Sequence, residues 1–445
     1  MAVMFGTDGV RGVANRELTP ELAFKLGRAA ASLLKPERGR GSIVIGRDTR
    51  HSGPMLEGAL LAGICSAGLD VYLAGVIPTP AIAFLTRELE ACAGAVISAS
   101  HNPAPDNGIK FFNHKGFKLD DELEEKIEAL VLGDLEGLPR PTGADLGKVI
   151  PLPDAVERYV NFLKNIVKGD LTGLKIVVDC ANGAAYQAAP ILLRRLGAEV
   201  IILNNEPDGI NINDECGSTH PAGLQKAVLE HKAHLGLAYD GDADRVIAVD
   251  EKGELVDGDK ILVICGLNLH EKNKLGKKIV VTVMSNWGLK QAFHKEKVEV
   301  LETKVGDRFV LEKMLESGAV LGGEQSGHII FLKHNTTGDG ILTSLQLLQV
   351  LKEKGQPLST LAQAMETYPQ VLRNVKVKSK QGWEKNSAIQ EAIARGENTL
   401  SGSGRILVRP SGTEPLIRVM AEGKDRTQLE TVVNLISDVI EKELG

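Results

Sequence analysis

A strand–turn–helix–strand pattern occurs three times along this chain of 445 residues, in segments 42–73, 175–203 and 278–301. Each copy begins with a β-branched apolar run, passes through a polar or glycine-containing turn into an amphipathic helix, and ends in a second apolar run. Such a unit places two parallel strands in one sheet with a helical crossover between them. We therefore predict domains of similar α/β architecture. A merely generic likeness between common units is the alternative.

Each copy is followed by another short apolar run that ends in a polar loop. These segments span residues 94–103, 235–245 and 318–328. In open α/β sheets, ligands bind beyond the carboxyl ends of the strands. The three loops are therefore expected to face one cleft.

The last part of the chain has a different pattern, with an alternating strand near 374–378 and a Pro- and Gly-containing loop at 409–415 between two apolar runs. One apolar face marks a closing helix: Leu429, Val432, Val433, Ile436, Val439, Ile440 and Leu444. The predicted fold is three similar mixed-sheet α/β domains plus a C-terminal α+β domain around a central cleft. The predicted boundaries are 1–150, 151–254, 255–368 and 369–445.

Composition excludes several classes of protein. Lys and Arg number 52 against 58 Asp and Glu, so the net charge of −6 and the aromatic content of 4% argue against a nucleic-acid binder. Apolar runs fall far short of the ~18 residues of a membrane helix, and no basic leader precedes an apolar core. The five cysteines are scattered without a Cys-x-x-Cys pair, which favours reduced thiols. We expect a cytoplasmic protein without membrane or nucleic-acid partners.

Three carboxylates stand at alternate positions in the segment Asp240-Gly-Asp-Ala-Asp-Arg. Side chains at i, i+2 and i+4 lie on one side of an extended chain, and the small residues between them let the segment curve around an ion. Mg²⁺ prefers such oxygen ligands. We predict Asp240, Asp242 and Asp244 as metal ligands. The alternatives are an EF-hand, which requires Gly where Arg245 stands, and a solvated acidic turn, in which the carboxylates would repel.

The segment Ala99-Ser-His-Asn-Pro offers a hydroxyl for chemistry. Ser100 could act as a nucleophile or carry a phosphoryl group, and Lys110 could move a proton or neutralise phosphate. A helix cap or a turn is the alternative. No Gly-x-Ser-x-Gly elbow is present, which weakens a serine-hydrolase interpretation.

The loop Arg409-Pro-Ser-Gly-Thr-Glu-Pro could clamp a phosphate. Its donors would be two guanidiniums, two hydroxyls and backbone N–H groups, from Arg409, Ser411, Gly412, Thr413 and Arg418. A plain hairpin loop is the alternative. Since no P-loop or dinucleotide-binding fingerprint follows a strand, nucleotide-driven chemistry loses support.

Two further loops carry polar candidates. In Glu324-Gln-Ser-Gly-His, Glu324 and Ser326 can bind sugar hydroxyls, and His328 can titrate near neutrality. Near the N-terminus, Arg11 can face an anion. A satisfied polar loop and a simple turn are the respective alternatives.

Together these loops resemble those of the α-D-phosphohexomutase family, in the same order and over essentially the whole chain. Residues 100–103 resemble its phosphoserine loop, 240–245 its metal loop, 324–328 its sugar-binding loop and 409–415 its phosphate-binding loop. Segments 7–12, 305–308 and 336–340, together with Gln325, most resemble the family's bacterial members that act on glucosamine phosphate. Members that act on mannose or glucose phosphates usually carry Met at the position of Gln325.

The resemblance implies an isomerase that interconverts glucosamine 6-phosphate and glucosamine 1-phosphate through phosphorylated Ser100 and a glucosamine 1,6-bisphosphate intermediate. This reaction feeds UDP-N-acetylglucosamine and peptidoglycan synthesis. Mg²⁺ would be held by the Ser100 phosphate and by Asp240, Asp242 and Asp244. Lys110 would be the general acid/base, with His328 a second candidate.

Other roles follow from the same resemblance. Arg245 would offset negative charge and His101 would support the serine loop. The 409–418 donors would hold the phosphate that is not transferred, and Glu324 and Ser326 would contact sugar hydroxyls. A homodimer formed through an early domain is expected.

Three alternative functions stay open at this point. The first is a phosphomannomutase or phosphoglucomutase with the same loops. The second is a metal-dependent phosphatase in which Ser100 is a transient acceptor. The third is a non-enzymatic Ca²⁺-binding module, motivated by the three aspartates.

Overall fold

The computed structural model describes residues 4–6, 8–36, 40–133, 135–167, 169–411 and 415–445. The chain divides into two compact units. The first contains Met1–Met284 and Val298–Ala364, and the second contains Ser285–Lys297 and Met365–Gly445. The expected first three domains thus contribute nearly all of one unit.

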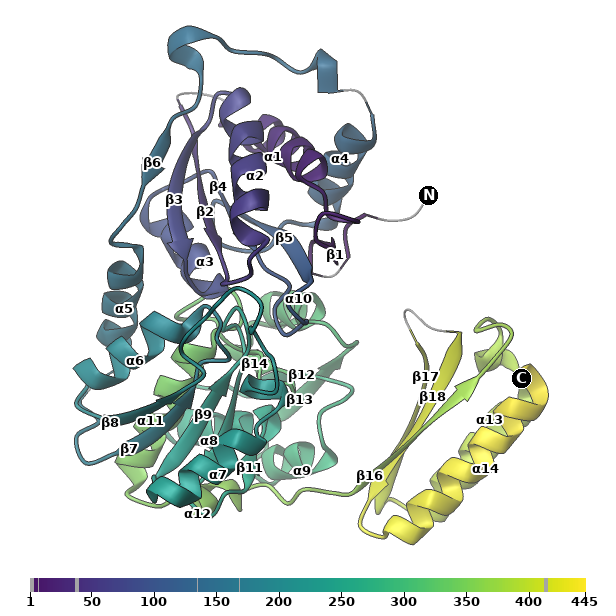
Figure 1. Cartoon of the computed structure of the whole chain (residues 1–445). Coiled ribbons are helices and arrows are strands. Elements are labelled where there is room, and N and C mark those ends of the chain that lie inside the picture. Colours follow the sequence, from purple (N-terminus) through teal and green to yellow (C-terminus); the bar gives the residue numbers. More distant parts are fainter. Residues whose placement is uncertain (1–3, 7, 37–39, 134, 168, 412–414) are drawn as a thin grey trace. The chain divides into compact units, whose positions relative to one another are not determined.

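The three repeats form three sheets with the same core order (Figure 1). In each sheet the first strand of the repeat lies between the second and third strands and runs parallel to both, while a fourth strand pairs antiparallel with the third. These strands are β2 (Ser42–Arg47), β3 (Asp70–Val76), β4 (Ala93–Ile97) and β5 (Asp106–Asn113); β7 (Lys175–Asp179), β8 (Glu199–Leu203), β9 (Leu235–Tyr239) and β10 (Val246–Asp250); and β12 (Lys278–Thr282), β13 (Glu299–Thr303), β14 (Leu321–Gly323) and β15 (Ile329–Phe331). The prediction of three similar mixed sheets is confirmed.

Short strands extend two of these sheets. The first sheet gains β1 (Val10–Val13) beside β5 and β6 (Val149–Pro151) beside β3. The second gains β11 (Leu255–Val256) beside β10. Because β1 pairs with β5, it brings the N-terminal segment next to the strand that carries Lys110.

Helices connect and cover the strands. The crossover helices of the three repeats are α2 (Gly53–Ser66), α6 (Ala185–Arg195) and α9 (Trp287–Lys295). The helices between second and third strands are α3 (Thr79–Glu88), α7 (Ala222–His231) and α10 (Asp307–Ser317). The remaining helices of the first unit are α1 (Pro20–Leu34), α4 (Asp121–Leu132), α5 (Ala155–Ile166), α8 (Gly258–Glu271), α11 (Gly340–Lys354) and α12 (Leu358–Ala362).

Glycines allow α1 and α2 to touch through their backbones. A Cβ atom at Gly27 would lie 2.3 Å from the carbonyl oxygen of Leu60, and one at Gly63 would lie 2.2 Å from that of Phe24. Any side chain at either position would separate the helices. The pair closes one face of the first sheet over a core that includes Leu26, Leu60 and Ile64.

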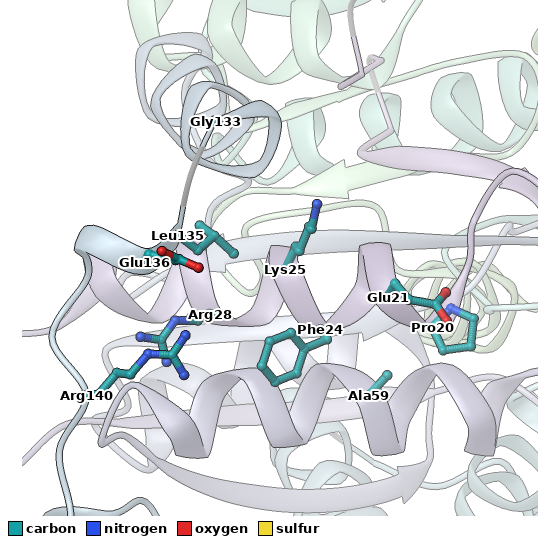
Figure 2. Close-up of a pocket in the computed structure, with 10 residues that line it drawn as sticks. All are labelled: Pro20, Glu21, Phe24, Lys25, Arg28, Ala59, Gly133, Leu135, Glu136 and Arg140. Carbon is teal, nitrogen blue, oxygen red and sulfur yellow. The ribbon is translucent and has the colours of Figure 1, made fainter.

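A cavity of about 520 Å³ lies beside α1 and is lined by Phe24, Arg28, Arg140 and their neighbours (Figure 2). The buried guanidinium of Arg28 donates to Ser66 of α2 and to the carbonyl oxygens of Leu138 and Pro139. Arg28 therefore ties the chain after α4 to the helix pair. None of the predicted site residues lines this cavity.

Besides the crossover helix α9, the second unit contains an antiparallel sheet covered by two helices. Its strand order is β16 (Gln370–Lys376), β18 (Leu416–Gly423), β17 (Gly404–Pro410), and its helices are α13 (Ser387–Leu400) and α14 (Arg426–Leu444). The predicted apolar face of the closing helix packs in its core, with Leu429, Val433 and Ile436 buried. The predicted α+β domain is confirmed.

Within the described residues, no helix is both long enough and apolar enough to cross a membrane.

Candidate active site

Three of the candidate loops lie at corresponding turns, one in each of the three sheets. Ser100 lies between β4 and β5, the aspartate segment between β9 and β10, and Glu324–His328 between β14 and β15. Each turn joins the third strand of a repeat to its antiparallel fourth strand. The shared topology thus places the three loops at equivalent sheet ends, as expected for ligand-binding loops.

Ser100 is buried and rigidly held. Its Oγ donates a hydrogen bond of 2.5 Å to Asp240 Oδ2. Its carbonyl oxygen accepts from Arg50 Nη2 at 3.1 Å and from Asn213 Nδ2 at 2.9 Å, and its N–H donates to Ser98 Oγ at 2.9 Å. Its φ of 51° lies in the left-handed region, which is costly for a residue other than glycine. The surrounding hydrogen bonds fix this conformation, as is common at functional sites.

The three aspartates form a compact, buried group. One carboxylate oxygen from each of Asp240, Asp242 and Asp244 lies within 4.8 Å of the others. Among the described residues, Oδ1 of Asp242 and Oδ1 of Asp244 have no hydrogen-bond donor although both atoms are buried. Ala243 adopts a φ of 58°, which curves the segment. Unsatisfied buried carboxylate oxygens in this arrangement fit a divalent cation.

The charges of this group are unevenly compensated. Burial and repulsion from Asp244 and Asp242 raise the pKa of Asp240 well above its ordinary value. Burial and repulsion from Asp242 likewise raise the pKa of Asp244. Burial also acts to raise the pKa of Asp242, but Lys110 and a hydrogen bond from Thr79 outweigh it and hold that pKa below its ordinary value. Without a cation, ionisation of Asp240 and Asp244 is therefore unfavourable.

Lys110 places a buried ammonium group beside the aspartates. Its Nζ lies 3.1 Å from Asp242 Oδ2 and 3.9 Å from Asp244 Oδ2, and its side chain is 2% exposed. Burial alone would lower its pKa, but the carboxylates of Asp242, Asp8 and Asp244 raise it overall. Lys110 is therefore protonated at neutral pH.

His328 and Arg245 meet the aspartates from the third and second sheets. His328 Nε2 lies 3.9 Å from Asp244 Oδ2 and 3.6 Å from Asp307 Oδ2, and within the described chain neither ring nitrogen has a hydrogen-bond partner. Arg245 Nε lies 3.8 Å from Asp244 Oδ1, and its backbone forms a β-bridge with His328. The fold thus brings both predicted residues to the aspartate group.

His101 lies next to Ser100, with Nδ1 3.4 Å from Ser100 Oγ. Burial, Arg245 and Arg11 lower its pKa to about 4. The imidazole is therefore neutral at physiological pH and adds no charge to the site.

A second ionic network borders the site. Lys118 Nζ lies 2.9 Å from Asp8 Oδ1 and also contacts Asp307, while Arg11 Nη2 lies 3.1 Å from Asp8 Oδ2. Burial would lower the pKa of Lys118, but the carboxylates of Asp307 and Asp8 raise it overall. The network ties the N-terminal segment and β5–α4 connection to α10, close to His328.

We expect Lys118→Met to destabilise the protein by about 3–5 kcal/mol, because two largely buried carboxylates would lose their shared counter-charge. Urea unfolding measures this change. The matched control is Lys126→Met, which breaks an exposed, solvent-screened pair with Glu122 on α4 and should leave stability nearly unchanged. Similar costs for both variants would contradict the role assigned to Lys118.

The sugar-loop candidates lie at the β14–β15 turn. Glu324 is nearly buried, and its Oε1 accepts from the N–H of Gly306 at 3.2 Å. Ser326 Oγ is buried and has no hydrogen-bond partner in the described chain. Gln325 Nε2 donates to Asp257 Oδ2 at 3.3 Å, which fixes the turn against the start of α8.

The phosphate-loop candidates belong to the second unit. Arg409 of β17 and Arg418 of β18 are directly paired across the strands. Burial and the nearby Arg418 lower the pKa of Arg409. Like charges placed opposite each other are unfavourable, so the pair suits a bound anion. Lys380 Nζ donates to the carbonyl oxygen of Ser411 at 2.7 Å. Gly412 and Thr413 lie outside the described residues.

Several residues at the site were not predicted. Thr79 donates to Asp242 Oδ2 at 2.7 Å, and its backbone N–H donates to the carbonyl oxygen of Asp242 at 2.9 Å. Arg50 and Asn213 hold the carbonyl oxygen of Ser100, and Asp307 lies beside His328. Thr79 is the first residue of α3. From the sequence, a threonine before a proline indicates only that a helix begins there.

Comparison with known families accounts for most of the chain. Models of the phosphoglucomutase/phosphomannomutase family match in order: α/β/α domain I at residues 2–136, domain II at 157–253, domain III at 257–368 and the C-terminal domain at 372–439.

Curated relatives and solved structures agree with this match. Phosphoglucosamine mutases of Desulforamulus reducens and Carboxydothermus hydrogenoformans are 62% and 64% identical to the chain, covering 99% of it and 99% and 100% of their own lengths. A phosphoglucomutase/phosphomannomutase family protein from Burkholderia thailandensis superposes with a TM-score of 0.82 at 26% identity, over 99% of this chain and 97% of its own. Aspergillus fumigatus N-acetylphosphoglucosamine mutase, solved with GlcNAc-6P and magnesium, shares the fold at a TM-score of 0.70 and 18% identity, over 99% and 95% of the two chains. The chain belongs to the phosphoglucosamine mutases of the phosphoglucomutase/phosphomannomutase family.

Proposed function

We propose that this protein interconverts glucosamine 6-phosphate and glucosamine 1-phosphate, with Ser100 as the phosphoryl carrier and glucosamine 1,6-bisphosphate as the intermediate. The observation that carries the proposal is the 2.5 Å hydrogen bond from Ser100 Oγ to Asp240, at the edge of a buried group of three aspartates. This arrangement sets a hydroxyl beside a divalent-cation site, as phosphoryl transfer requires. The names of the full-length relatives supply the substrate class.

Two transfers make up the proposed reaction. In the first, a sugar hydroxyl oxygen bonds to phosphorus while the bond from phosphorus to Ser100 Oγ breaks. The hydroxyl gives up a proton and Oγ takes one. In the second, Oγ bonds to the other phosphorus of the bisphosphate and the sugar oxygen leaves, which restores phosphoserine and releases the isomer.

Asp240, Asp242 and Asp244, with a phosphate oxygen on Ser100, would hold the metal ion, for which we propose Mg²⁺. When bound, the ion supplies charge neutralisation and Lewis-acid polarisation of the phosphoryl oxygens. Three carboxylates, a phosphoserine of about −2 and a divalent cation leave an excess of roughly −3. Lys110 and Arg245 are placed to offset it.

Proton transfer falls to two side chains in this proposal. Protonated Lys110 donates to Ser100 Oγ as the bond to phosphorus breaks. His328, whose ring nitrogens are free of hydrogen bonds among the described residues, accepts the proton of the sugar hydroxyl. Neutral His101 orients the serine loop without adding charge.

Substrate contacts complete the proposal. Arg409, Ser411, Gly412, Thr413 and Arg418 would bind the phosphate that is not being transferred, and Arg11 would face substrate anion. Glu324 and Ser326 would bind sugar hydroxyls, for which the unpartnered, buried Oγ of Ser326 is suited.

The test compares kcat/KM for glucosamine, glucose and mannose phosphates, with Mg²⁺ and a trace of the matching sugar bisphosphate. We expect a preference of ~100-fold for glucosamine phosphate, which corresponds to about 2.7 kcal/mol of transition-state discrimination. A preference for glucose or mannose phosphates would replace the substrate assignment while keeping the mutase chemistry. Steady release of inorganic phosphate without isomer formation would instead indicate a phosphatase.

A further inference from the structure

Another cavity lies in the first unit, and none of the described residues of the candidate active site lines it. It is a cavity of about 370 Å³ between α8, α11 and β15. This volume falls in the range of small-molecule pockets, which is about 300–1,000 Å³. Its apolar wall is formed by Ile166, Leu269, Val320 and Phe331.

The cavity also carries positive charge that the protein leaves uncompensated. Lys272, Lys274 and Lys333 line it. Lys272 is paired with Glu353, whereas Lys274 and Lys333 form no ion pair with any described residue. In a chain with a net charge of −6, two unpaired ammonium groups at one cavity are positioned to attract an anion.

His334, which follows Lys333 in sequence, also lines the cavity and is half-buried. Burial, followed by the charges of Lys333 and Lys274, lowers the pKa of His334. The imidazole is therefore neutral near pH 7 and offers one N–H donor and one acceptor. It adds hydrogen-bonding capacity without adding repulsion between cations.

Two amide side chains, those of Asn268 and Gln349, also line the cavity. Glu353 accepts from Gln349 Nε2 at 3.1 Å and from Asn268 Nδ2 at 3.4 Å. These contacts direct amide nitrogens to the carboxylate, so the side-chain carbonyl oxygens of Asn268 and Gln349 are the groups left to accept from a ligand. Their preferred ligand group is an N–H donor.

We propose that this cavity is a second ligand site, which binds a nucleoside monophosphate. The phosphate would lie at Lys274 and Lys333, the flat base would cover the apolar wall, and an N–H of the base would donate to the amide oxygens. A uracil base has one such N–H between two carbonyl groups. No part of the proposed mutase reaction uses these residues, so the site is separate from catalysis.

Titration calorimetry on the full-length protein tests the proposal with uridine monophosphate, uridine and inorganic phosphate as probes. We expect binding of uridine monophosphate, and binding at least tenfold weaker for uridine and for phosphate alone. The double variant Lys274→Glu/Lys333→Glu should weaken binding of the nucleotide by at least tenfold. The matched control, Lys226→Glu/Lys295→Glu, makes the same change in net charge on exposed helical surfaces and should leave binding unchanged.

Three results would overturn the proposal. These are no binding of the nucleotide at millimolar concentration, equal weakening in both double variants, and phosphate alone binding as tightly as the nucleotide. Mutase turnover and thermal unfolding check that both double variants are folded, and neither should change. If the first double variant does not fold, Lys274→Gln/Lys333→Gln removes the charges without reversing them and the same outcomes apply.

Discussion

Replacing Ser100 with alanine should abolish mutase turnover, with a loss of about 10⁴-fold or more in kcat/KM. At 1.36 kcal/mol per tenfold, this loss is about 5.5 kcal/mol of transition-state stabilisation. The reason is that the proposed reaction passes through an ester of Ser100 Oγ, and among the described residues no other side-chain hydroxyl donates to Asp240. Incorporation of ³²P from labelled sugar bisphosphate into the protein should disappear in parallel.

The backbone at Ser100 provides a control for this variant. Since Ser100 has a φ of 51°, alanine keeps the conformational cost while glycine removes it. Ser100→Gly should therefore be about 1 kcal/mol more stable than Ser100→Ala in urea unfolding, and both should be inactive. Full turnover or persistent labelling in Ser100→Ala would remove the serine from the mechanism. Inactivity combined with lost stability would instead show a folding defect.

The sheets could be predicted from the sequence because their signal is local. Apolar periodicity marks each strand and helix of the three repeats: the first repeat, predicted at 42–73, forms β2, α2 and β3 between Ser42 and Val76. The three sheets share one strand order because each is built from the same strand–helix–strand pattern, whose connections follow the same rules of handedness. The face of α14 was predicted for the same reason.

The contacts that complete the site could not be predicted in this way. Thr79 is 163 residues from Asp242 in sequence, and Lys110 is 132 residues from it. Lysine and threonine are common on surfaces, and only the contacts of α3 and β5 with the loop after β9 show that these two share one carboxylate. The same holds for Asn213, whose amide reaches the carbonyl oxygen of Ser100.

The metal segment shows the difference between chemistry and geometry. Alternate aspartates predicted a cation site, but the sequence presents the three carboxylates as equivalent. In the structure they differ. Despite burial, Lys110 and a hydrogen bond from Thr79 hold the pKa of Asp242 below its ordinary value, whereas burial, followed by repulsion from neighbouring aspartates, raises the pKa of Asp240 and of Asp244. Because of this difference, replacing aspartate with asparagine should change stability in opposite directions at positions 240 and 242.

We expect Asp240→Asn and Asp242→Asn both to lose at least about 10³-fold in mutase turnover, but to change stability in opposite directions when Mg²⁺ is removed by a chelator. Asparagine at 240 removes repulsion and still accepts from Ser100 Oγ, but it loses the bond that the other oxygen accepts from the N–H of Arg245. Asp240→Asn should therefore be about 1 kcal/mol more stable than the natural protein. Asparagine at 242 leaves the buried Lys110 ammonium without its nearest counter-charge, so Asp242→Asn should be about 3 kcal/mol less stable. Urea unfolding with and without Mg²⁺ measures both changes.

The direction in which stability changes with pH shows whether the effect of Asp240→Asn comes from charge repulsion or from packing. Because the folded-state pKa of Asp240 is raised above its ordinary 3.8, the folded protein binds more protons than the unfolded chain above that pH, and its stability falls as pH rises toward the raised pKa. The advantage of Asp240→Asn should therefore be absent below about pH 4 and grow as pH rises. Saturating Mg²⁺ should reverse the order, because a bound cation stabilises the protein with all three carboxylates more than the variant that lacks one. An advantage that ignores both pH and Mg²⁺ would mean that the aspartates do not repel in the folded protein, and the assignment of a cation site to them would fail.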